Sequence, residues 1–288
     1  MGLLRKVLTT LEMIKWEHSV FALPFALSGA VLAASGWPAW SKIFWIVVCM
    51  ISARSAAMAF NRWADARLDA ANPRTASRAL PAGTLSRSFV AGFIVVTSLV
   101  FVLAASQLNR VTLILSPVAL GVLLLYSYTK RFTRWSHLVL GLALGIAPAA
   151  AWIAIRGTLD PRILVLTAAV ICWVGGFDVL YACQDMNHDR QAGLFSIPQS
   201  WGVRAAFWIA RTMHLLMLGL LCRLVQLFAL NAVAWAGIAV VAMLLLYEHL
   251  IVSPSDLRRL NAAFFTMNGI ISVVFFVFVA TAVLFPKM

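Results

Sequence analysis

Five of the ten acidic residues in this chain lie in two short clusters, each at the end of a long apolar run. The first cluster contains Asp65-x-x-x-Asp69, and the second contains Asp185-x-x-x-Asp189 with Asp178 seven residues before it. The two pairs are offset by the same 120 residues (65 to 185, 69 to 189). Carboxylates are costly in apolar segments and commonly mark a functional site there. Because Mg²⁺ prefers a few carboxylates together with phosphate oxygens, the clusters predict two halves of one magnesium site.

The predicted metal ligands carry oxygen and fall on two helix faces. They are Asn61, Asp65, Asp69, Asp178, Asp185 and Asp189. The first three lie at i, i+4 and i+8, and the last three at i, i+7 and i+11, so each set shares one face of a helix that continues through its motif. The four aspartates of the two pairs are also the predicted catalytic residues.

Basic residues in the neighbouring loops are suited to bind phosphate, Arg through two parallel hydrogen bonds and Lys as a point charge. The predicted diphosphate-binding residues are Arg62, Arg74, Arg78, Lys130 and Arg131. Arg54 lies seven residues before Asn61 inside an apolar run, so it needs an anionic or hydrogen-bonding partner. That partner is a substrate carboxylate, a phosphate or Asp178. Tyr181 shares the face of the second cluster, and Arg54 and Tyr181 are the predicted acceptor-binding residues.

Nine apolar segments must position these side chains. They span residues 16–35, 40–60, 88–106, 111–128, 136–155, 162–182, 205–227, 231–251 and 262–285. Each is about 20 residues long, which is enough for a helix to cross roughly 30 Å of hydrocarbon. A mean hydropathy of +0.92 and a charged fraction of 11% exclude an ordinary soluble domain. The sequence therefore predicts an all-α integral membrane protein with the lipid bilayer as a partner.

The net charge of +13 is concentrated in alternate loops, which explains it better than binding to nucleic acid does. Basic residues in short loops mark the cytoplasmic side, so nine spans place the N-terminus and both aspartate clusters in the cytoplasm. We predict one transmembrane domain over residues 1–288, capped by cytoplasmic loops at about 61–87, 129–135 and 183–204.

The 120-residue offset also predicts an internal repeat. Two four-helix units plus one further helix would surround a central cavity, with the second and sixth spans facing each other across it. Membrane proteins built from such repeats commonly place their site between the halves.

The motifs resemble those of the UbiA superfamily of intramembrane aromatic prenyltransferases. The similar stretches are Asn61-Arg-x-x-Asp65-x-x-x-Asp69-x-x-Asn72-Pro73-Arg74-Thr75-x-x-Arg78, Asp178-x-x-Tyr181-Ala182-x-Gln184-Asp185-x-x-x-Asp189, and the runs Glu17–Ala26, Tyr126–Arg131 and Ser196–Pro198. The Asn61-Arg62 form, in place of Asn-Asp, is similar to the 4-hydroxybenzoate polyprenyltransferase-like branch. The resemblance implies nine membrane helices, Mg²⁺ held by the aspartates, a polyprenyl diphosphate donor, an aromatic acid acceptor, and a bacterial inner-membrane location with the site facing the cytoplasm.

Three functions remain open at this point. The first is transfer of a polyprenyl group to 4-hydroxybenzoate in quinone biosynthesis. The second is the same chemistry on 1,4-dihydroxy-6-naphthoate or a related acceptor of menaquinone synthesis. The third, in a different class, is a cation-coupled membrane transporter with paired aspartates. Transporter sites usually lie near the bilayer midplane on broken helices. Because these aspartates are expected at helix ends beside basic loops, the sequence favours an enzyme.

Overall fold

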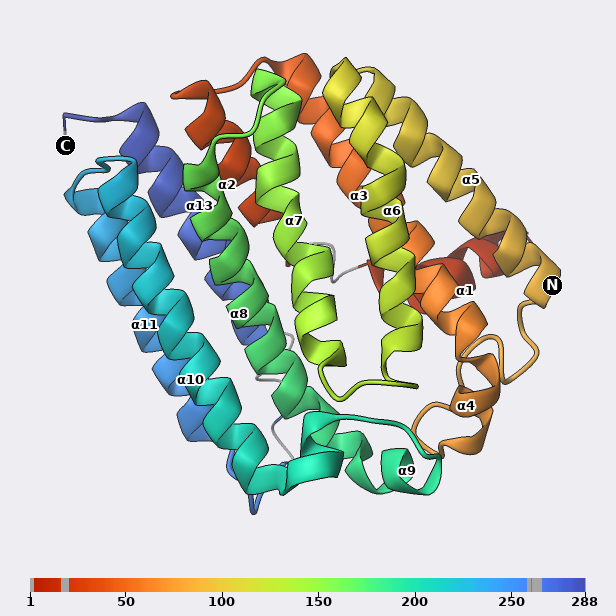
Figure 1. Cartoon of the computed structure of the whole chain (residues 1–288). Coiled ribbons are helices and arrows are strands. Elements are labelled where there is room, and N and C mark those ends of the chain that lie inside the picture. The colour runs from red at the N-terminus through yellow and green to blue at the C-terminus, as the bar shows by residue number, and fades with distance from the viewer. Residues whose placement is uncertain (1–2, 17–20, 258–259, 261–265, 288) are drawn as a thin grey trace.

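The computed structural model describes residues 3–16, 21–257, 260 and 266–287. Glu17 and His18, which belong to one of the resembling runs, lie outside the described residues. Within the described ranges the chain is a bundle of helices (Figure 1). The helices are α1 (Leu3–Ile14), α2 (Leu23–Ala34), α3 (Trp40–Ala64), α4 (Ala66–Ala71), α5 (Arg87–Ser106), α6 (Arg110–Thr129), α7 (Ser136–Arg156), η2 (Pro161–Ile163), α8 (Leu164–Tyr181), η3 (Ala182–Asp185), α9 (Met186–Gln191), α10 (Ile197–Leu227), α11 (Ala232–Ile251) and α13 (Asn268–Leu284).

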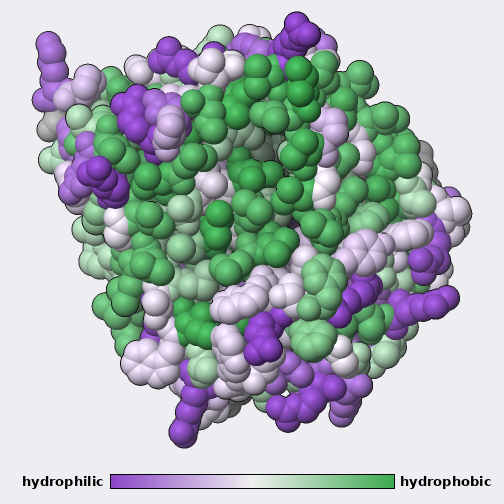
Figure 2. Space-filling view, in the orientation of Figure 1, coloured by the Kyte–Doolittle hydropathy of each residue, from purple (hydrophilic) through white to green (hydrophobic). Residues whose placement is uncertain are grey.

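The predicted apolar segments coincide closely with these helices. Seven helical stretches of the described residues are long and apolar enough to cross a membrane, whereas α2 and α13 are shorter apolar helices. The predicted spans 16–35 and 262–285 extend into residues that are not described, so the count of nine remains a prediction. Figure 2 shows apolar side chains across the middle of the visible face, with polar ones gathered toward its two ends. This distribution is that of a multi-pass membrane protein.

One helix was not predicted. Helix α1 buries Met13 and Ile14 against Ala59, Leu85 and Val90, which lie on or near α3 and α5. Its other apolar side chains, such as Leu4 and Leu8, are exposed. A short helix with one buried face and exposed leucines is typical of an element that lies along the membrane surface. The sequence-based segmentation missed it because the helix is too short and too charged to span.

Side-chain caps fix where several helices begin. The side chain of Ser86 accepts a hydrogen bond from the backbone N–H of Phe89 at the start of α5, and Asn109 accepts one from Thr112 at the start of α6. Such caps satisfy backbone donors that have no partner within the helix. Gly157, with φ of 74°, ends α7 in the left-handed region that glycine adopts without strain.

Small residues allow α7 to approach its neighbours closely. A methyl group added to Gly29 of α2 would overlap the backbone of Pro148 in α7, and one added to Gly141 would overlap the backbone of Ile171 in α8. Close approach of backbones at small residues is a common means of packing helices within a membrane. Helix α7 thus joins α2 to α8.

Gly29→Ala is therefore expected to destabilise the bundle by about 1–3 kcal/mol, the usual range for overpacking. The measurement is the thermal unfolding midpoint in detergent, monitored by circular dichroism. Gly121→Ala is the matched control, because a methyl group at Gly121 of α6 meets nothing within 4 Å. Equal midpoints for the two variants would contradict close packing of α2 on α7.

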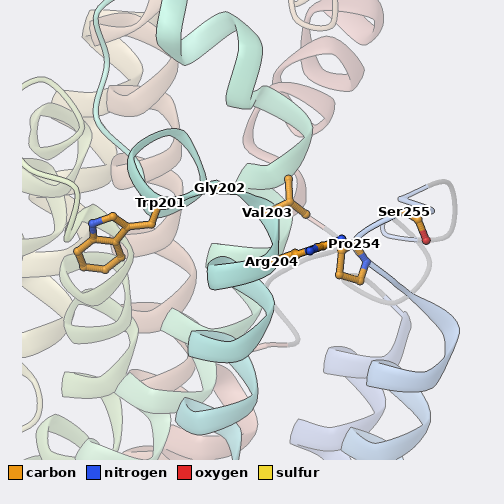
Figure 3. Close-up of a pocket in the computed structure, with 6 residues that line it drawn as sticks. All are labelled: Trp201, Gly202, Val203, Arg204, Pro254 and Ser255. Atoms are coloured by element: carbon orange, nitrogen blue, oxygen red, sulfur yellow. The ribbon is translucent and has the colours of Figure 1, made fainter.

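Helix α10 bends near its start. Gly202 has φ of 81° and ψ of 167°, which interrupts the helix between Trp201 and Val203. A surface pocket lies beside this bend, and it is lined by residues 201–204 together with Pro254 and Ser255 (Figure 3). None of its lining residues belongs to the predicted site.

Candidate active site

The two aspartate clusters meet at one end of the bundle. Helix α4 follows the end of α3, and η3 and α9 follow the end of α8; α4 and α9 lie at the same end in Figure 1. Contacts join the clusters directly, because Asn72 Nδ2 donates to Asp185 Oδ1 at 3.2 Å and Arg74 Nε donates to the same oxygen at 2.9 Å. Both residues follow the first cluster, so the loop after α4 crosses to the second.

The backbone has nearly the same conformation at the first aspartate of each pair. Asp65 has φ of −94° and ψ of 4°, and Asp185 has φ of −100° and ψ of 1°. Each of these residues is followed by a helix of six residues, Ala66–Ala71 or Met186–Gln191. The equivalence at a 120-residue offset (65 to 185) agrees with the predicted repeat at the level of the motif.

The two motifs differ in how the preceding helix ends. In the first, Asp65 N–H donates to Asn61 O at 2.9 Å and Asp69 N–H donates to Asp65 O at 2.8 Å, so helical hydrogen bonding continues through the motif. In the second, Ala182–Asp185 forms a 3₁₀ turn. Because a 3₁₀ turn rotates each residue further than an α-helix does, Asp178, Asp185 and Asp189 do not follow one continuous α-helical spacing.

Asp65 is buried, with 2% of its surface exposed, and is surrounded by cations from the α6–α7 loop. Lys130 Nζ lies 2.6 Å from Asp65 Oδ2, and Arg131 Nη2 donates to Asp65 Oδ1 at 2.9 Å. Asn61 Nδ2 also donates to Oδ2 at 3.3 Å. A buried carboxylate requires such compensation. The loop containing Lys130 and Arg131 is thereby fixed over the first cluster.

Asp69 is buried and has one satisfied oxygen. Arg78 Nη1 donates to Asp69 Oδ1 at 2.7 Å, whereas Asp69 Oδ2 is buried and has no hydrogen-bond partner. Buried polar atoms are nearly always hydrogen-bonded, so an orphaned carboxylate oxygen indicates a position suited to an additional ligand.

Asp185 is held by Arg74 through the two-pronged geometry that a guanidinium and a carboxylate favour. Arg74 Nε donates to Oδ1, and Arg74 Nη2 donates to Oδ2. Arg74 Nη1 also donates to the hydroxyl of Tyr181 at 3.1 Å. Burial acts to lower the pKa of Arg74, but the hydrogen bond and attraction of Asp185 raise it overall, so the guanidinium stays charged. Arg74 therefore connects Asp185 and Tyr181 to the loop after the first cluster.

Asp178 and Asp189 face partners from two other elements. Asp178 Oδ2 lies 2.7 Å from Nδ1 of His137, a buried residue at the start of α7. Ser196 Oγ donates to Asp189 Oδ2 at 3.1 Å. His137 was missed by the sequence analysis, whose only available signal was a lone histidine at the predicted cytoplasmic end of an apolar segment. Asn72 and Ser196 lay within the resembling motifs but had no predicted role.

The donor set fits magnesium by its chemistry. The carboxylates of both clusters lie at one end of the bundle, and one of their oxygens, Asp69 Oδ2, has no hydrogen-bond partner. The surrounding cations can pair with phosphate as well as with carboxylate. No group of three His, Cys, Asp or Glu side chains among the described residues already forms a metal cage. Each of Asp65, Asp69 and Asp185 is instead paired with Lys or Arg. The arrangement suits Mg²⁺ that arrives with a phosphate group, since Mg²⁺ usually retains few protein ligands.

Two further predicted residues, Arg54 and Arg62, lie on α3 before the first aspartate pair. Arg54 Nη2 donates to the backbone oxygen of Lys15 at 3.3 Å, beside α1, while Asp178 interacts with His137. Arg62, at the end of α3, lies near enough to Asp69 and Asp65 to interact with their charges. Ligand binding by Arg54, Arg62 and the other candidate site residues remains a prediction.

Comparison with known proteins identifies the family. The sequence model of the UbiA prenyltransferase family matches residues 22–270. The 4-hydroxybenzoate octaprenyltransferase of Vibrio cholerae is 32% identical over 225 residues, which cover 77% of this chain and 78% of the relative. The corresponding enzyme of Marinomonas sp. is 33% identical over 214 residues, covering 72% and 75% of the two chains.

Solved structures share the fold. The apo structure of a UbiA homologue from Aeropyrum pernix has a TM-score of 0.83 at 30% identity and covers 91% of this chain and 96% of its own. A UbiA homologue from Archaeoglobus fulgidus bound to DMAPP and Mg²⁺ has a TM-score of 0.71 at 18% identity, covering 96% and 99%. With a family match over most of its length, and with paired aspartates joined across one end of an apolar helical bundle, this chain belongs to the UbiA prenyltransferase family.

Proposed function

We propose that this membrane prenyltransferase transfers a polyprenyl group from a polyprenyl diphosphate to the ring of 4-hydroxybenzoate in a magnesium-dependent reaction. The observation that carries the proposal is the connection of the two aspartate clusters through Asn72 and Arg74. It brings carboxylates and cations to one end of the bundle, which supports a shared site for Mg²⁺ and diphosphate. The similar enzymes of Vibrio cholerae and Marinomonas sp., named for 4-hydroxybenzoate and an octaprenyl group, support the acceptor and a long donor.

The cations of the site have a role in leaving-group departure. When bound, Mg²⁺ would supply Lewis-acid stabilisation of the diphosphate, held by Asp65, Asp69, Asp185 and Asp189, with Asn61 and Asp178 supporting. Arg62, Arg74, Arg78, Lys130 and Arg131 would exchange their carboxylate partners for phosphate oxygens. Fixed cations aimed at the departing group stabilise the charge that develops as the C–O bond breaks.

The prenyl carbon then requires an electron-rich partner and a dry environment. Cleavage of the C–O bond leaves an allylic cation, which the ring carbon of the acceptor attacks with its π electrons. Loss of the ring proton restores aromaticity, and the released diphosphate can accept that proton. The apolar helices beneath the site exclude water that would otherwise capture the cation.

Arg54 is the proposed partner of the acceptor carboxylate, and Tyr181 the proposed contact of its ring. Arg54→Ala is expected to raise KM for 4-hydroxybenzoate by about tenfold, because a charge-assisted hydrogen bond contributes roughly 1.5–3 kcal/mol. KM for the prenyl donor should change by less than about twofold. Steady-state kinetics with each substrate varied in turn measures both constants. An unchanged acceptor KM would reject this role.

The activity itself is tested with purified protein in nanodiscs, radiolabelled geranyl diphosphate and a panel of aromatic acids. The proposal expects labelled product with 4-hydroxybenzoate, complete dependence on Mg²⁺, and loss of product on addition of EDTA. Product with 1,4-dihydroxy-6-naphthoate alone would retain the chemistry but replace the acceptor. No transfer to any aromatic acid would contradict the proposed function.

The proposed location is the inner membrane of a bacterium, with the aspartate clusters facing the cytoplasm. The concentration of Lys and Arg in loops on the side of the clusters supports this orientation. Labelling of single cysteines introduced into the α4–α5 and α7–α8 loops of a cysteine-free variant, with an impermeant reagent on intact cells, tests it. Reaction is expected only in the α7–α8 loop.

A further inference from the structure

Three consecutive residues at the start of α10, where Ser196 is the N-cap, contact three separate parts of the site. Phe195 N–H donates to the backbone oxygen of Lys130 at 2.7 Å. Ser196 Oγ donates to Asp189, and Ile197 N–H donates to Nε2 of His137 at 3.3 Å. We call residues 195–197 the junction segment. It connects the loop over Asp65, the second cluster and the start of α7.

Two features fix this segment at the start of α10. The Oγ of Ser196 accepts from Gln199 N–H at 3.3 Å while it donates to Asp189, so this hydroxyl serves both the helix cap and the site. Pro198 follows as an early residue of the helix, a position where its missing N–H has no cost. The junction segment is therefore rigidly attached to the long helix behind it.

The ring of His137 completes the connection. Because Nε2 accepts the backbone N–H of Ile197, it carries no hydrogen, and the neutral ring must carry its hydrogen on Nδ1. Nδ1 then donates to Asp178 Oδ2 at 2.7 Å. The bond on one side of the ring thus fixes the tautomer that serves the other side. His137 is 3% exposed, so water does not compete for either bond.

We infer that His137 is a positioning residue, which fixes Asp178 through Nδ1 and the junction segment through Nε2. The inference rests on the proposed function, since Asp178 is placed there among the residues that support the site. Its chemical basis is general. Mutation of a residue that orients a ligating carboxylate commonly lowers activity or metal affinity by about 10-fold to 100-fold. The two ring nitrogens have separable roles, and this makes the inference testable.

Two amide variants divide those roles. The amide nitrogen of Asn can occupy roughly the place of Nδ1, so His137→Asn retains a donor to Asp178 and loses the acceptor for Ile197. The amide oxygen of Gln can occupy roughly the place of Nε2, so His137→Gln retains the acceptor and loses the donor.

The first readout is prenyl transfer. His137→Gln is expected to lower kcat about tenfold with donor KM within about twofold, because Arg74 and Lys130 still bind phosphate. His137→Asn should retain kcat within about threefold. The second readout needs no activity: trypsin cleavage after Arg190, an exposed residue of α9, in ligand-free protein. His137→Asn releases the junction segment and should raise this cleavage rate about tenfold, whereas His137→Gln should not.

The matched control is His249→Gln. His249 Nε2 lies 2.9 Å from His214 Nδ1, between α11 and α10, which carry neither aspartate cluster. Neither kcat nor cleavage after Arg190 should change. The inference is overturned if both His137 variants match the wild type in both readouts, or if each variant changes both readouts together. Should the wild-type protein transfer no prenyl group, the proposed function fails, and the cleavage comparison still decides whether His137 fixes the junction segment.

Discussion

Asp65→Asn is expected to lower kcat/KM for prenyl transfer by about 10³-fold, because a neutral amide cannot take the role proposed for this carboxylate, which is to hold Mg²⁺ on the diphosphate. Added Mg²⁺ should not restore the rate. The fold should survive, although Lys130 and Arg131 lose their counter-charge. Their side chains are 33% and 29% exposed, so water solvates them in part, and the cost in stability is about 1–3 kcal/mol. Kinetics with labelled geranyl diphosphate across a Mg²⁺ titration, together with the thermal midpoint, measures both effects.

Asp160→Asn is the matched control for this change. Asp160 accepts hydrogen bonds from Arg162 between α7 and α8, at the opposite end of the bundle from the clusters. Asp160→Asn makes the same chemical substitution and also removes an ion pair. Its kcat/KM should stay within about twofold of the wild type. Full activity of Asp65→Asn would remove the metal assignment. An equal loss in both variants would show that the effect does not arise at the site.

Arg74→Ala is expected to lower kcat/KM for the prenyl donor by about 10²-fold to 10³-fold. This is the usual effect of removing a hydrogen-bond donor that stabilises the charge developing in the transition state. Arg74 is the side chain that joins Asp185 and Tyr181 to the first half of the site, and its two-pronged geometry suits phosphate as well as carboxylate. Arg74→Lys should recover only part of the loss, because an ammonium group is a point charge. Initial rates at varied donor concentration separate KM from kcat.

Arg67→Ala controls for the removal of positive charge. Arg67 lies on α4 near Arg74 in sequence but is exposed, so its effect should stay within about threefold. If Arg74→Lys restored full activity, the site would need only a charge at this position, and the proposed two-pronged contact with phosphate would be wrong. If Arg67→Ala matched Arg74→Ala, the loss would reflect the general surface charge.

Local patterns in the sequence predicted most of the framework. Helices α3 and α7 begin at the first residues of the predicted spans 40–60 and 136–155 and end within a few residues of the predicted ends. The length of an apolar run determines whether a helix can cross a bilayer, so these bounds depend on few distant contacts. Helix α1 was not predicted because its apolar run is too short and too charged to be recognised as a membrane span. The partners of Arg54 were also not predictable, since an apolar segment does not reveal which backbone oxygen packs beside it.

The sequence by itself determined that two acidic clusters terminate membrane helices on one side, because spacing and hydropathy are local properties of the chain. Only the tertiary structure decided which charges meet. Arg78 pairs with Asp69 nine residues away, whereas Arg74 reaches across to Asp185 and His137 to Asp178. These choices depend on how helices from distant parts of the chain are rotated in the bundle, which sets the direction of each side chain. Such rotations arise from packing between distant segments, and no spacing rule within one segment contains them.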